Sequence, residues 1–420
     1  MMPRATERLA DSRYARPGLI RGDAYGRYEA IFAGVEAPFA FVDLDAMWSN
    51  AESMLGGRNG KPIRVASSAL RCRALLDRIL KRDPGFAGVL SFTLPEALFL
   101  AGAGFRDVVV GYPTIDRTAI GRLADLAGKD PEGAPILMVD EGAHLDLIEE
   151  AMTKGPTTIG VCLDLDLSWR PLGRRGPTVG LKRSPIRTPE DAARAAIEIN
   201  ARPGVRLEGV MAYEGQIASV GDARPGSPFR NLAVRRMQKS SARELRSRRA
   251  AMVAAVREVA DLRLVNGGGT ASLEQTAAEG AITEVTAGSG FYAPALFDHF
   301  RKLELTPAAA FVLPVVRRSD AGVVTALGGG YIASGPGGGD RLPAPYLPDG
   351  LKLDHMEGAG EVQTPLVGPG ANAVRAGHRV YLRHAKAGEL CERFNSLYLV
   401  EGEEIVDEVA TYRGEGQAFL

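Results

Sequence analysis

Two glycine-rich segments carry the clearest chemical signal in the sequence. NGGGT covers residues 266–270, and AGSG covers residues 287–290. Each follows a short run of apolar and β-branched residues, so each is expected to be the turn that ends a buried strand. Glycines let the backbone approach an anion, while N–H groups and the hydroxyls of Thr270 and Ser289 can donate to it. One such turn is more simply structural, but two together predict a phosphate site for a sugar phosphate, a nucleotide or pyridoxal phosphate.

The elements that would position these turns follow a repeated pattern. Short apolar runs alternate with longer segments of helical period, which is typical of βα units around a parallel sheet. Eight strands are expected, at residues 63–67, 88–93, 107–113, 135–141, 157–166, 207–215, 262–269 and 282–290. Eight consecutive units favour an α/β fold with a closed (β/α)8 TIM barrel over an open doubly wound sheet. Both glycine turns then open on one face of the barrel, after its seventh and eighth strands.

The sequence on either side of the barrel predicts further units. We expect a barrel at residues 58–302 and, because short apolar runs punctuated by Gly and Pro follow it, a C-terminal antiparallel β domain at 303–420. Residues 1–57 are expected to hold one strand and one helix, with Asp45 capping the helix. That strand, in PFAFVDLDAMWSN, is predicted to join the C-terminal β domain.

Composition limits the classes of partner. The 420 residues are 45% hydrophobic and 24% charged, which suffices for a large core and two domains. Lys plus Arg and Asp plus Glu both number 51, so no net field attracts nucleic acid or an acidic membrane, and a small molecule is the expected partner. Cys72, Cys162 and Cys391 follow no paired spacing, and no apolar run is long enough to span a bilayer. We therefore expect a soluble protein of the reducing cytoplasm.

Five segments taken together resemble a known enzyme family. PFAFVDLDAMWSN, AYEGQ, NGGGT, AGSGFY and HAKAGELCERF resemble the fold-type III pyridoxal-phosphate enzymes, the superfamily of the alanine racemase N-terminal domain. The resemblance is strongest to a bacterial branch of amino acid deaminases and aldolases that is similar to D-threonine aldolase and D-serine dehydratase. It implies a pyridoxal-phosphate-dependent lyase that acts on D-β-hydroxy amino acids, by aldol cleavage or by dehydration and deamination. A small amino acid is then the expected substrate.

The resemblance also implies where the cofactor would bind. It implies that the cofactor phosphate lies against Gly267, Gly268, Gly269, Thr270, Gly288, Ser289 and Tyr292. Tyr213 is expected near the cofactor ring, although a packed aromatic is an equal interpretation of this residue alone. Gln216 is expected to donate to the cofactor or the substrate, unless it is a surface turn residue.

A divalent metal, zinc or manganese, is a further implication of the resemblance. In D-threonine aldolase and D-serine dehydratase a His and a nearby Cys or Asp of the C-terminal domain hold the metal, and His384 and Cys391 are the candidates here. His and thiolate suit zinc, but a compact His-x-Cys or His-x-Asp pair is absent at this point. The alternative is a solvated His384 with Cys391 as a small buried residue, and Lys386 or Glu389 as the polar group that enters the site.

One position departs from the family pattern. The family's Schiff-base lysine ends the first barrel strand, and in IRVASSALRC the matching residue is Ser68. A serine can neither form the imine nor move the substrate Cα proton, so activity is in doubt. Lys61 begins the same strand and is expected at the opposite barrel end. Lys182 and Lys386 are expected nearer the barrel mouth, the carboxyl end of the strands at which the two glycine turns open. A substituted but active enzyme, a relocated lysine and a non-catalytic binder of pyridoxal phosphate or another phosphorylated ligand remain open.

An amino acid racemase is a third hypothesis. Such an enzyme needs a tyrosine base from the C-terminal domain of a partner subunit, and Tyr331 in GGGYIASG is the candidate. The simpler interpretation of Tyr331 is ordinary strand packing. A homodimer is compatible with either enzymatic hypothesis.

Overall fold

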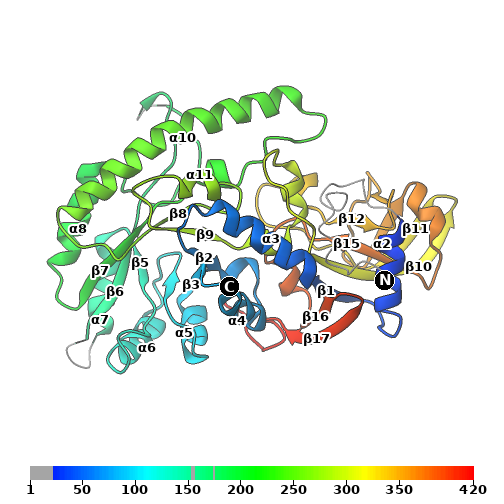
Figure 1. Ribbon diagram of the computed structural model, residues 1–420, viewed down its shortest axis with the longest axis horizontal. Coiled ribbons are helices and arrows are strands. Elements are labelled where there is room, and N and C mark those ends of the chain that lie inside the picture. The colour runs from blue at the N-terminus through cyan, green and yellow to red at the C-terminus, as the bar shows by residue number, and fades with distance from the viewer. Residues whose placement is uncertain (1–21, 153–156, 174–175) are drawn as a thin grey trace.

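The computed structural model describes residues 22–152, 157–173 and 176–420, and its two domains lie side by side (Figure 1). The larger domain contains eight parallel strands in the hydrogen-bonded order β4-β3-β2-β9-β8-β7-β6-β5. A parallel bridge between Val109 and Ile136 brings the two edges of this sheet together. The strands are β2 (Ile63–Ala66), β3 (Phe86–Ser91), β4 (Val108–Val110), β5 (Leu137–Val139), β6 (Ile159–Asp164), β7 (Val205–Met211), β8 (Leu264–Gly267) and β9 (Glu284–Ala287). The predicted (β/α)8 barrel is confirmed, and each strand overlaps one of the expected segments.

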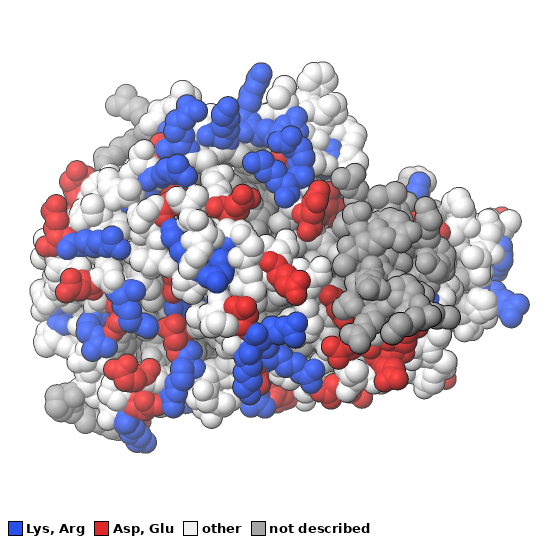
Figure 2. Space-filling model, viewed as in Figure 1, with Lys and Arg blue, Asp and Glu red and all other residues white. Residues whose placement is uncertain are grey.

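Helices form the outer layer of the barrel. They are α3 (Leu44–Gly57), α4 (Arg73–Arg82), α5 (Leu94–Gly102), α6 (Arg117–Ala127), α7 (Gly142–Ala151), α8 (Pro189–Asn200), α10 (Pro228–Arg257) and α11 (Leu273–Ala277), with the short α9 (Gly215–Ala218) and α12 (Ser289–Tyr292). Thr93, Asp116 and Thr188 each accept a hydrogen bond from the backbone N–H three residues ahead, and so begin α5, α6 and α8. Lys and Arg side chains gather over α10 on the face shown in Figure 2.

Alternate strand residues point into the barrel, as the pleat of a strand requires. An apolar cluster in the lumen comprises Val109, Ile136, Met138, Cys162, Met211 and Leu264, with Leu90 packed against it. On β2 and β9 the lumen is polar instead. The Arg64 side chain is 1% exposed and binds Glu284 through two contacts, Nε–Oε1 at 2.6 Å and Nη2–Oε2 at 2.8 Å. Asp107 accepts from Arg64 at 3.0 Å, so this guanidinium joins three parts of the barrel wall.

The smaller domain is a nine-stranded sheet with one strand from the N-terminal part of the chain. Its strands are β1 (Phe39–Asp43), β10 (Ala309–Asp320), β11 (Val323–Leu327), β12 (Ala344–Leu347), β13 (Lys352–Leu353), β14 (Gln363–Val367), β15 (Arg379–Arg383), β16 (Ser396–Glu401) and β17 (Glu404–Ala410). Strand β1 lies between β10, its antiparallel neighbour, and β16, its parallel neighbour. All other strand pairs among the described residues of this sheet are antiparallel. The predicted C-terminal antiparallel domain is confirmed.

Helix α3 leads from β1 into the barrel, and its start differs from the expectation. Asp43 caps the helix, because its side chain accepts from the Ala46 N–H at 3.1 Å. Asp45 instead accepts from the Gly402 N–H at 2.9 Å and so holds the turn between β16 and β17. Before β1, helix α2 (Gly22–Ile31) contributes Arg27, which forms a 2.8 Å ion pair with the same Asp43. No helix in the described ranges is long and apolar enough to cross a membrane.

The buried Arg64–Glu284 pair gives a test of the barrel. Glu284→Ala is expected to destabilise the protein by about 3–5 kcal/mol, because it leaves the Arg64 charge buried with one partner fewer. The exposed pair Lys81–Asp77 on α4 is the control, and Asp77→Ala is expected to cost less than about 1 kcal/mol. Urea unfolding of the variants measures both. Equal losses for the two substitutions would contradict the role given to Arg64.

Candidate functional site

The two glycine turns lie together at the carboxyl end of the barrel. The Gly290 N–H donates to the Thr270 hydroxyl at 3.1 Å and so joins them. Gly268 has φ +85°, and a Cβ on Gly269 would lie 3.3 Å from the Tyr213 ring. A Cβ on Gly288 would lie 2.7 Å from the Ala66 carbonyl oxygen, at the end of β2. These close approaches require glycine, and they place both turns beside the end of the first barrel strand.

The buried carboxylate of Glu214 holds the first glycine turn in place. Glu214 accepts from the Gly268 N–H at 3.3 Å, from the Ser272 hydroxyl at 2.6 Å and from the Thr276 hydroxyl at 2.5 Å. It also pairs with Arg249 of α10, which reaches Glu279 at 2.7 Å. In the described part of the chain, the backbone N–H groups of residues 270, 271 and 289 have no acceptor. The turns therefore offer free donors on the side away from Glu214.

Ser68 lies in the short turn η2 (Ser67–Ala69) that follows β2. Its carbonyl accepts from Arg71 Nε at 3.1 Å, and a Cβ added to Gly388 of the β domain would lie 2.0 Å from the same oxygen. The neighbouring Ser67 is fully buried and donates to the Leu90 carbonyl. The structure therefore places Ser68 at the barrel mouth, where the β domain covers it.

Tyr213 and Gln216 follow β7 at the same mouth. The Tyr213 hydroxyl lies 2.8 Å from the Ser219 hydroxyl, and the Arg183 guanidinium lies 6.0 Å from the centre of the Tyr213 ring and 5.0 Å from that of Tyr112. Gln216 is 2% exposed and donates to the Leu167 carbonyl at 2.8 Å, while its Oε1 has no partner among the described residues. Tyr213 thus borders the first turn, and Gln216 is a buried residue rather than a surface one.

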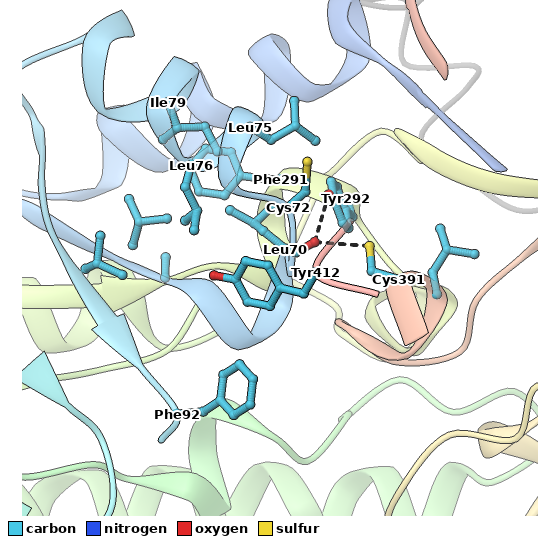
Figure 3. Packing of buried hydrophobic residues seen from close by; sticks show 14 of the residues in the cluster. Leu70, Cys72, Leu75, Leu76, Ile79, Phe92, Phe291, Tyr292, Cys391 and Tyr412 are labelled. Atoms are coloured by element: carbon cyan, nitrogen blue, oxygen red, sulfur yellow. Dashed lines mark hydrogen bonds between the residues drawn. The ribbon is translucent and has the colours of Figure 1, made fainter. Parts of the chain in front are cut away.

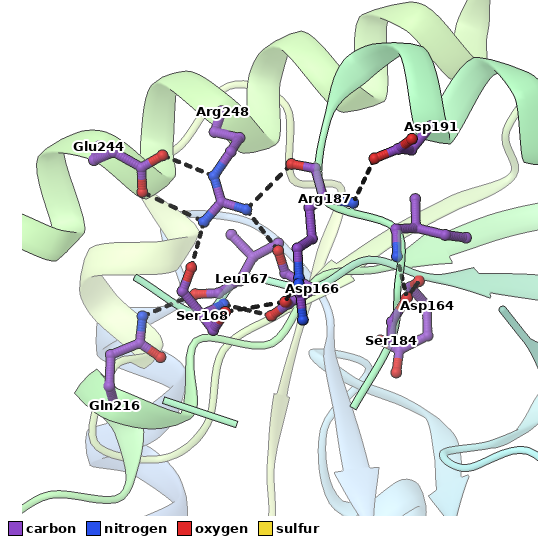
Figure 4. A network of polar contacts seen from close by, with 11 residues as sticks. Asp164, Asp166, Leu167, Ser168, Ser184, Arg187, Asp191, Gln216, Glu244 and Arg248 are labelled. Carbon is purple, nitrogen blue, oxygen red and sulfur yellow. Dashed lines mark hydrogen bonds and ion pairs between the residues drawn. The ribbon is translucent and has the colours of Figure 1, made fainter. Parts of the chain in front are cut away.

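The segment after β6, which carries Arg183, is closed by a polar network (Figure 4). Arg248 of α10 donates to the carbonyls of Asp166 and Ser168 at 2.6 and 2.7 Å. Ser184 donates to the Asp164 carbonyl at 2.7 Å, and Arg187 pairs with Asp166. The two ends of the segment are therefore tied together and to α10, which holds Arg183 over the mouth.

Tyr292 and Cys391 meet at a single backbone oxygen. The Tyr292 hydroxyl and the Cys391 thiol both lie 3.1 Å from the Leu70 carbonyl (Figure 3). Burial raises the pKa of Cys391, which keeps it a neutral thiol. Both residues are fully buried, and through Cys391 the β domain is attached to the turn after β2.

His384 is a buried side chain without a hydrogen-bond partner. It is 2% exposed, neither ring nitrogen has a partner among the described residues, and its ring lies edge-on to Tyr292 at 6.1 Å. Burial, followed by the charge of Arg383, lowers the pKa of His384 to about 3, so the imidazole is neutral. The described residues contain no group of three or more His, Cys, Asp or Glu side chains arranged to hold a metal ion.

The three lysines considered as replacements at position 68, Lys61, Lys182 and Lys386, differ in their surroundings. Lys61 donates to the Glu279 carbonyl before β2 begins, and Lys182 is exposed. Lys386 is partly buried and its Nζ lies 3.2 Å from the Ser334 hydroxyl. Burial, followed by the charge of Arg341, lowers the pKa of Lys386 below its ordinary value.

Two carboxyl groups at the strand ends were not among the expected site residues. Glu96 on α5 is fully buried and accepts from the Phe92 N–H at 2.7 Å and from the Tyr412 hydroxyl at 2.8 Å. Burial raises the pKa of Glu96 to about 7, and burial together with the charge of Asp140 raises that of Asp164 to about 7. No local pattern in the sequence indicates either shift, since Glu96 lies in the first turn of α5, where an acid is ordinarily solvated, and Asp164 is the last residue of β6.

Known proteins with this geometry were found by sequence and by structure. No protein-family model matches the chain. It is 27% identical over 262 residues to D-threonine aldolase of an Arthrobacter species, and the match spans 61% of each chain. The structure of D-threonine aldolase from Filomicrobium marinum superposes with a TM-score of 0.74 at 19% identity, over 90% of this chain and 96% of that one. The chain therefore has the fold of the fold-type III enzymes.

A second solved structure agrees with that assignment. D-threo-3-hydroxyaspartate dehydratase from Delftia sp. HT23 superposes with a TM-score of 0.69 at 18% identity, over 91% of this chain and 98% of that one. The resemblance to fold-type III pyridoxal-phosphate enzymes that the motifs predicted is therefore confirmed. The sequence match to the Arthrobacter enzyme covers only about three fifths of that enzyme's length, whereas the fold match covers nearly the whole of both solved structures.

The raised pKa of Glu96 predicts a pH dependence of stability. The ordinary pKa of the Glu96 carboxyl is 4.5, and its pKa in the folded protein is about 7. Between these pH values the folded state holds a proton that the unfolded chain has lost. Stability should therefore fall as pH rises through this window, by on the order of 3 kcal/mol, and then level off. Urea unfolding across the window should show that Glu96→Gln removes this part of the slope.

The matched control for that experiment is Glu52→Gln. Glu52 lies exposed on α3, so its carboxyl is solvated in both states. The control should keep the slope of the unsubstituted protein. If Glu96→Gln kept it as well, the buried carboxyl would not be the source of the pH dependence.

Proposed function

We propose that this protein binds pyridoxal 5′-phosphate at the carboxyl end of its barrel and acts on D-β-hydroxy amino acids, by aldol cleavage or dehydration. The observation that carries the proposal is the pair of joined glycine turns with free N–H donors beside the end of β2. Backbone N–H groups and hydroxyls in this arrangement suit a phosphate dianion. The named activities of D-threonine aldolase and D-threo-3-hydroxyaspartate dehydratase support the class of substrate.

The residues present fit part of the cofactor. Gly267, Gly268, Gly269, Thr270, Gly288 and Ser289 would hold the phosphate, and the Tyr213 ring, which borders Gly269, would position the pyridine ring. Tyr292 would act less directly, because its hydroxyl is engaged by the Leu70 carbonyl. Gln216 would support the mouth from its bond to Leu167. Ser68 does not fit a covalent link to the aldehyde.

The chain's own groups would handle the substrate. Pyridoxal phosphate, when bound, supplies an electron sink for the Cα carbanion of an amino acid. Arg183, held over the mouth, would attract the substrate carboxylate. The neutral His384 imidazole would accept a hydrogen bond at its unprotonated ring nitrogen, and a divalent metal held there would need ligands other than the Cys391 thiol, which donates to Leu70. The β domain meets the mouth at Gly388, beside the Ser68 carbonyl.

A non-catalytic cofactor-binding protein is the second candidate. The specific observation that favours it is Ser68, which removes the expected amine and leaves the phosphate turns intact. A racemase has less support, because Tyr331 packs within its own subunit against Phe311 and Phe394, at ring distances of 4.9 and 5.8 Å. A homodimer and a location in the cytoplasm stay predictions from the sequence.

Cofactor binding can be tested at the first glycine turn. Gly269→Ala should weaken the affinity for pyridoxal phosphate by about tenfold or more, because the added methyl group meets the Tyr213 ring and Ala218 and shifts the turn. Gly280→Ala is the control, since a Cβ there would meet nothing within 4 Å. Equilibrium dialysis measures both affinities. The proposal fails if the unsubstituted protein shows no saturable binding that inorganic phosphate competes with.

Restoring the missing amine tests the class of activity. Ser68→Lys should bind pyridoxal phosphate covalently at position 68 and should then cleave or dehydrate D-threonine or D-threo-3-hydroxyaspartate. Ser67→Lys serves as the neighbouring control. It is not expected to gain this activity, because the Ser67 side chain is fully buried. A folded Ser68→Lys protein that binds the cofactor without turnover of either substrate would argue against a lyase site.

A further inference from the structure

We propose that Lys386 is the amine that links covalently to the cofactor aldehyde in this chain, in place of the side chain at position 68. The inference rests on the proposed binding of pyridoxal phosphate and assigns a residue to a role that Ser68 cannot fill. Three observations carry it: the burial of Lys386 among the lysines, the position of its backbone, and the state of its ammonium group.

Burial separates Lys386 from almost all other lysines. Of the eight lysines in the described ranges, six are exposed, and only Lys61 and Lys386 are not. Lys61 precedes β2 and is bound to the Glu279 carbonyl, at the barrel end opposite the glycine turns. An exposed lysine is ordinarily solvated, so Lys386 is the one described lysine that is both sheltered and near the mouth.

The backbone around Lys386 is anchored on both sides to the barrel mouth. The carbonyls of His384 and Ala385 accept from the N–H groups of Ala295 and Leu296 at 3.0 and 2.9 Å, in the segment that follows the second glycine turn and α12. Two residues after Lys386, Gly388 touches the Ser68 carbonyl, with φ +82°. Two residues span at most about 7 Å, so Lys386 is held between the second turn and position 68.

The Lys386 ammonium group has a single hydrogen-bond partner among the described residues. In the part of the chain that the structure describes, Lys386 forms no ion pair, and its one hydrogen bond joins Nζ to the Ser334 hydroxyl at 3.2 Å. The Glu389 carboxylate accepts instead from the Ser334 N–H at 3.0 Å. A single neutral hydrogen bond is worth about 1 kcal/mol, so the side chain is free to turn toward a ligand.

Other groups place Lys386 on the same mouth as the first glycine turn. The charged residues that act on it are Arg341, Glu389 and Arg183. Arg183 lies over the Tyr213 ring, and Tyr213 packs against Gly269. Lys386, the two glycine turns and Ser68 therefore lie at the same end of the barrel.

The chemical step needs no further reactant. The neutral ε-amine of Lys386 adds to the aldehyde carbon, a C=N bond forms, and the aldehyde oxygen leaves as one molecule of water with the two amine protons. No oxidation or reduction occurs. Borohydride then reduces the C=N bond to a stable secondary amine, which marks the residue that formed it.

The experiment is to mix the full-length protein with pyridoxal phosphate, reduce it with borohydride and map the modified peptide by mass spectrometry. The expected adduct lies on Lys386, is lost in Lys386→Met and is kept in Lys182→Met, which removes an exposed lysine near the mouth. Equilibrium dialysis of Lys386→Met should still show saturable binding, weaker by about tenfold, through the glycine turns. The double variant Ser68→Lys with Lys386→Met should regain an adduct, now on position 68, which shows that the fold survives.

The outcomes separate this inference from the proposed function. Saturable binding with no adduct, or with an adduct on another lysine, overturns the role of Lys386 and leaves cofactor binding in place. No binding by the unsubstituted protein overturns the proposed function and the inference with it. An adduct that persists at equal yield in Lys386→Met also overturns the role of Lys386.

Discussion

The first glycine turn depends on the buried carboxylate of Glu214. That carboxylate receives the Gly268 N–H, two hydroxyl groups and the Arg249 guanidinium, so its charge is fully engaged inside the protein. Arg249 in turn serves Glu279, and the loss of this arginine would leave two carboxylates buried without a cation. The Gly268 N–H donates to Glu214 and the Gly269 N–H to Ser272, which leaves the N–H groups of residues 270 and 271 without an acceptor among the described residues. The proposed anion site thus depends on a turn that a buried anion already holds in place.

The β domain completes the mouth. It reaches the barrel through Cys391 at the Leu70 carbonyl, Gly388 at the Ser68 carbonyl and Tyr412 at Glu96. All three contacts lie on or beside the turn after β2, the strand whose end carries the altered position. A change in the side chain at 68 therefore takes place inside an interface between domains, and the β domain is the part of the protein best placed to compensate for it.

The sequence predicted those parts that local patterns determine. The eight barrel strands and the glycine turns follow from short apolar runs and Gly clusters, and they were identified. The role of Glu214 in holding the first glycine turn could not be predicted from AYEGQ. Its partner Arg249 is 35 residues away on α10, where it is one of many basic residues. The sequence pattern predicts Asp45 as the helix cap, whereas Asp43 caps the helix in the structure. Both acids lie where β1 ends, and only the contact of Asp45 with Gly402 distinguishes their roles. The partners of Tyr292 and Cys391 could not be foreseen, because Leu70 is 222 and 321 residues away from them.

The position of β1 has a consequence for how the chain folds. Phe41 in β1 pairs with Ala310 on one side and with Tyr398 on the other, so the centre of the smaller sheet joins the beginning of the chain to its end. During synthesis the barrel segments emerge before β16 does, and β1 must wait with its apolar side chains and one strand edge unpaired. Contacts of such long sequence separation form slowly. The early lifetime of this protein therefore includes a period in which a formed barrel carries an unfinished sheet.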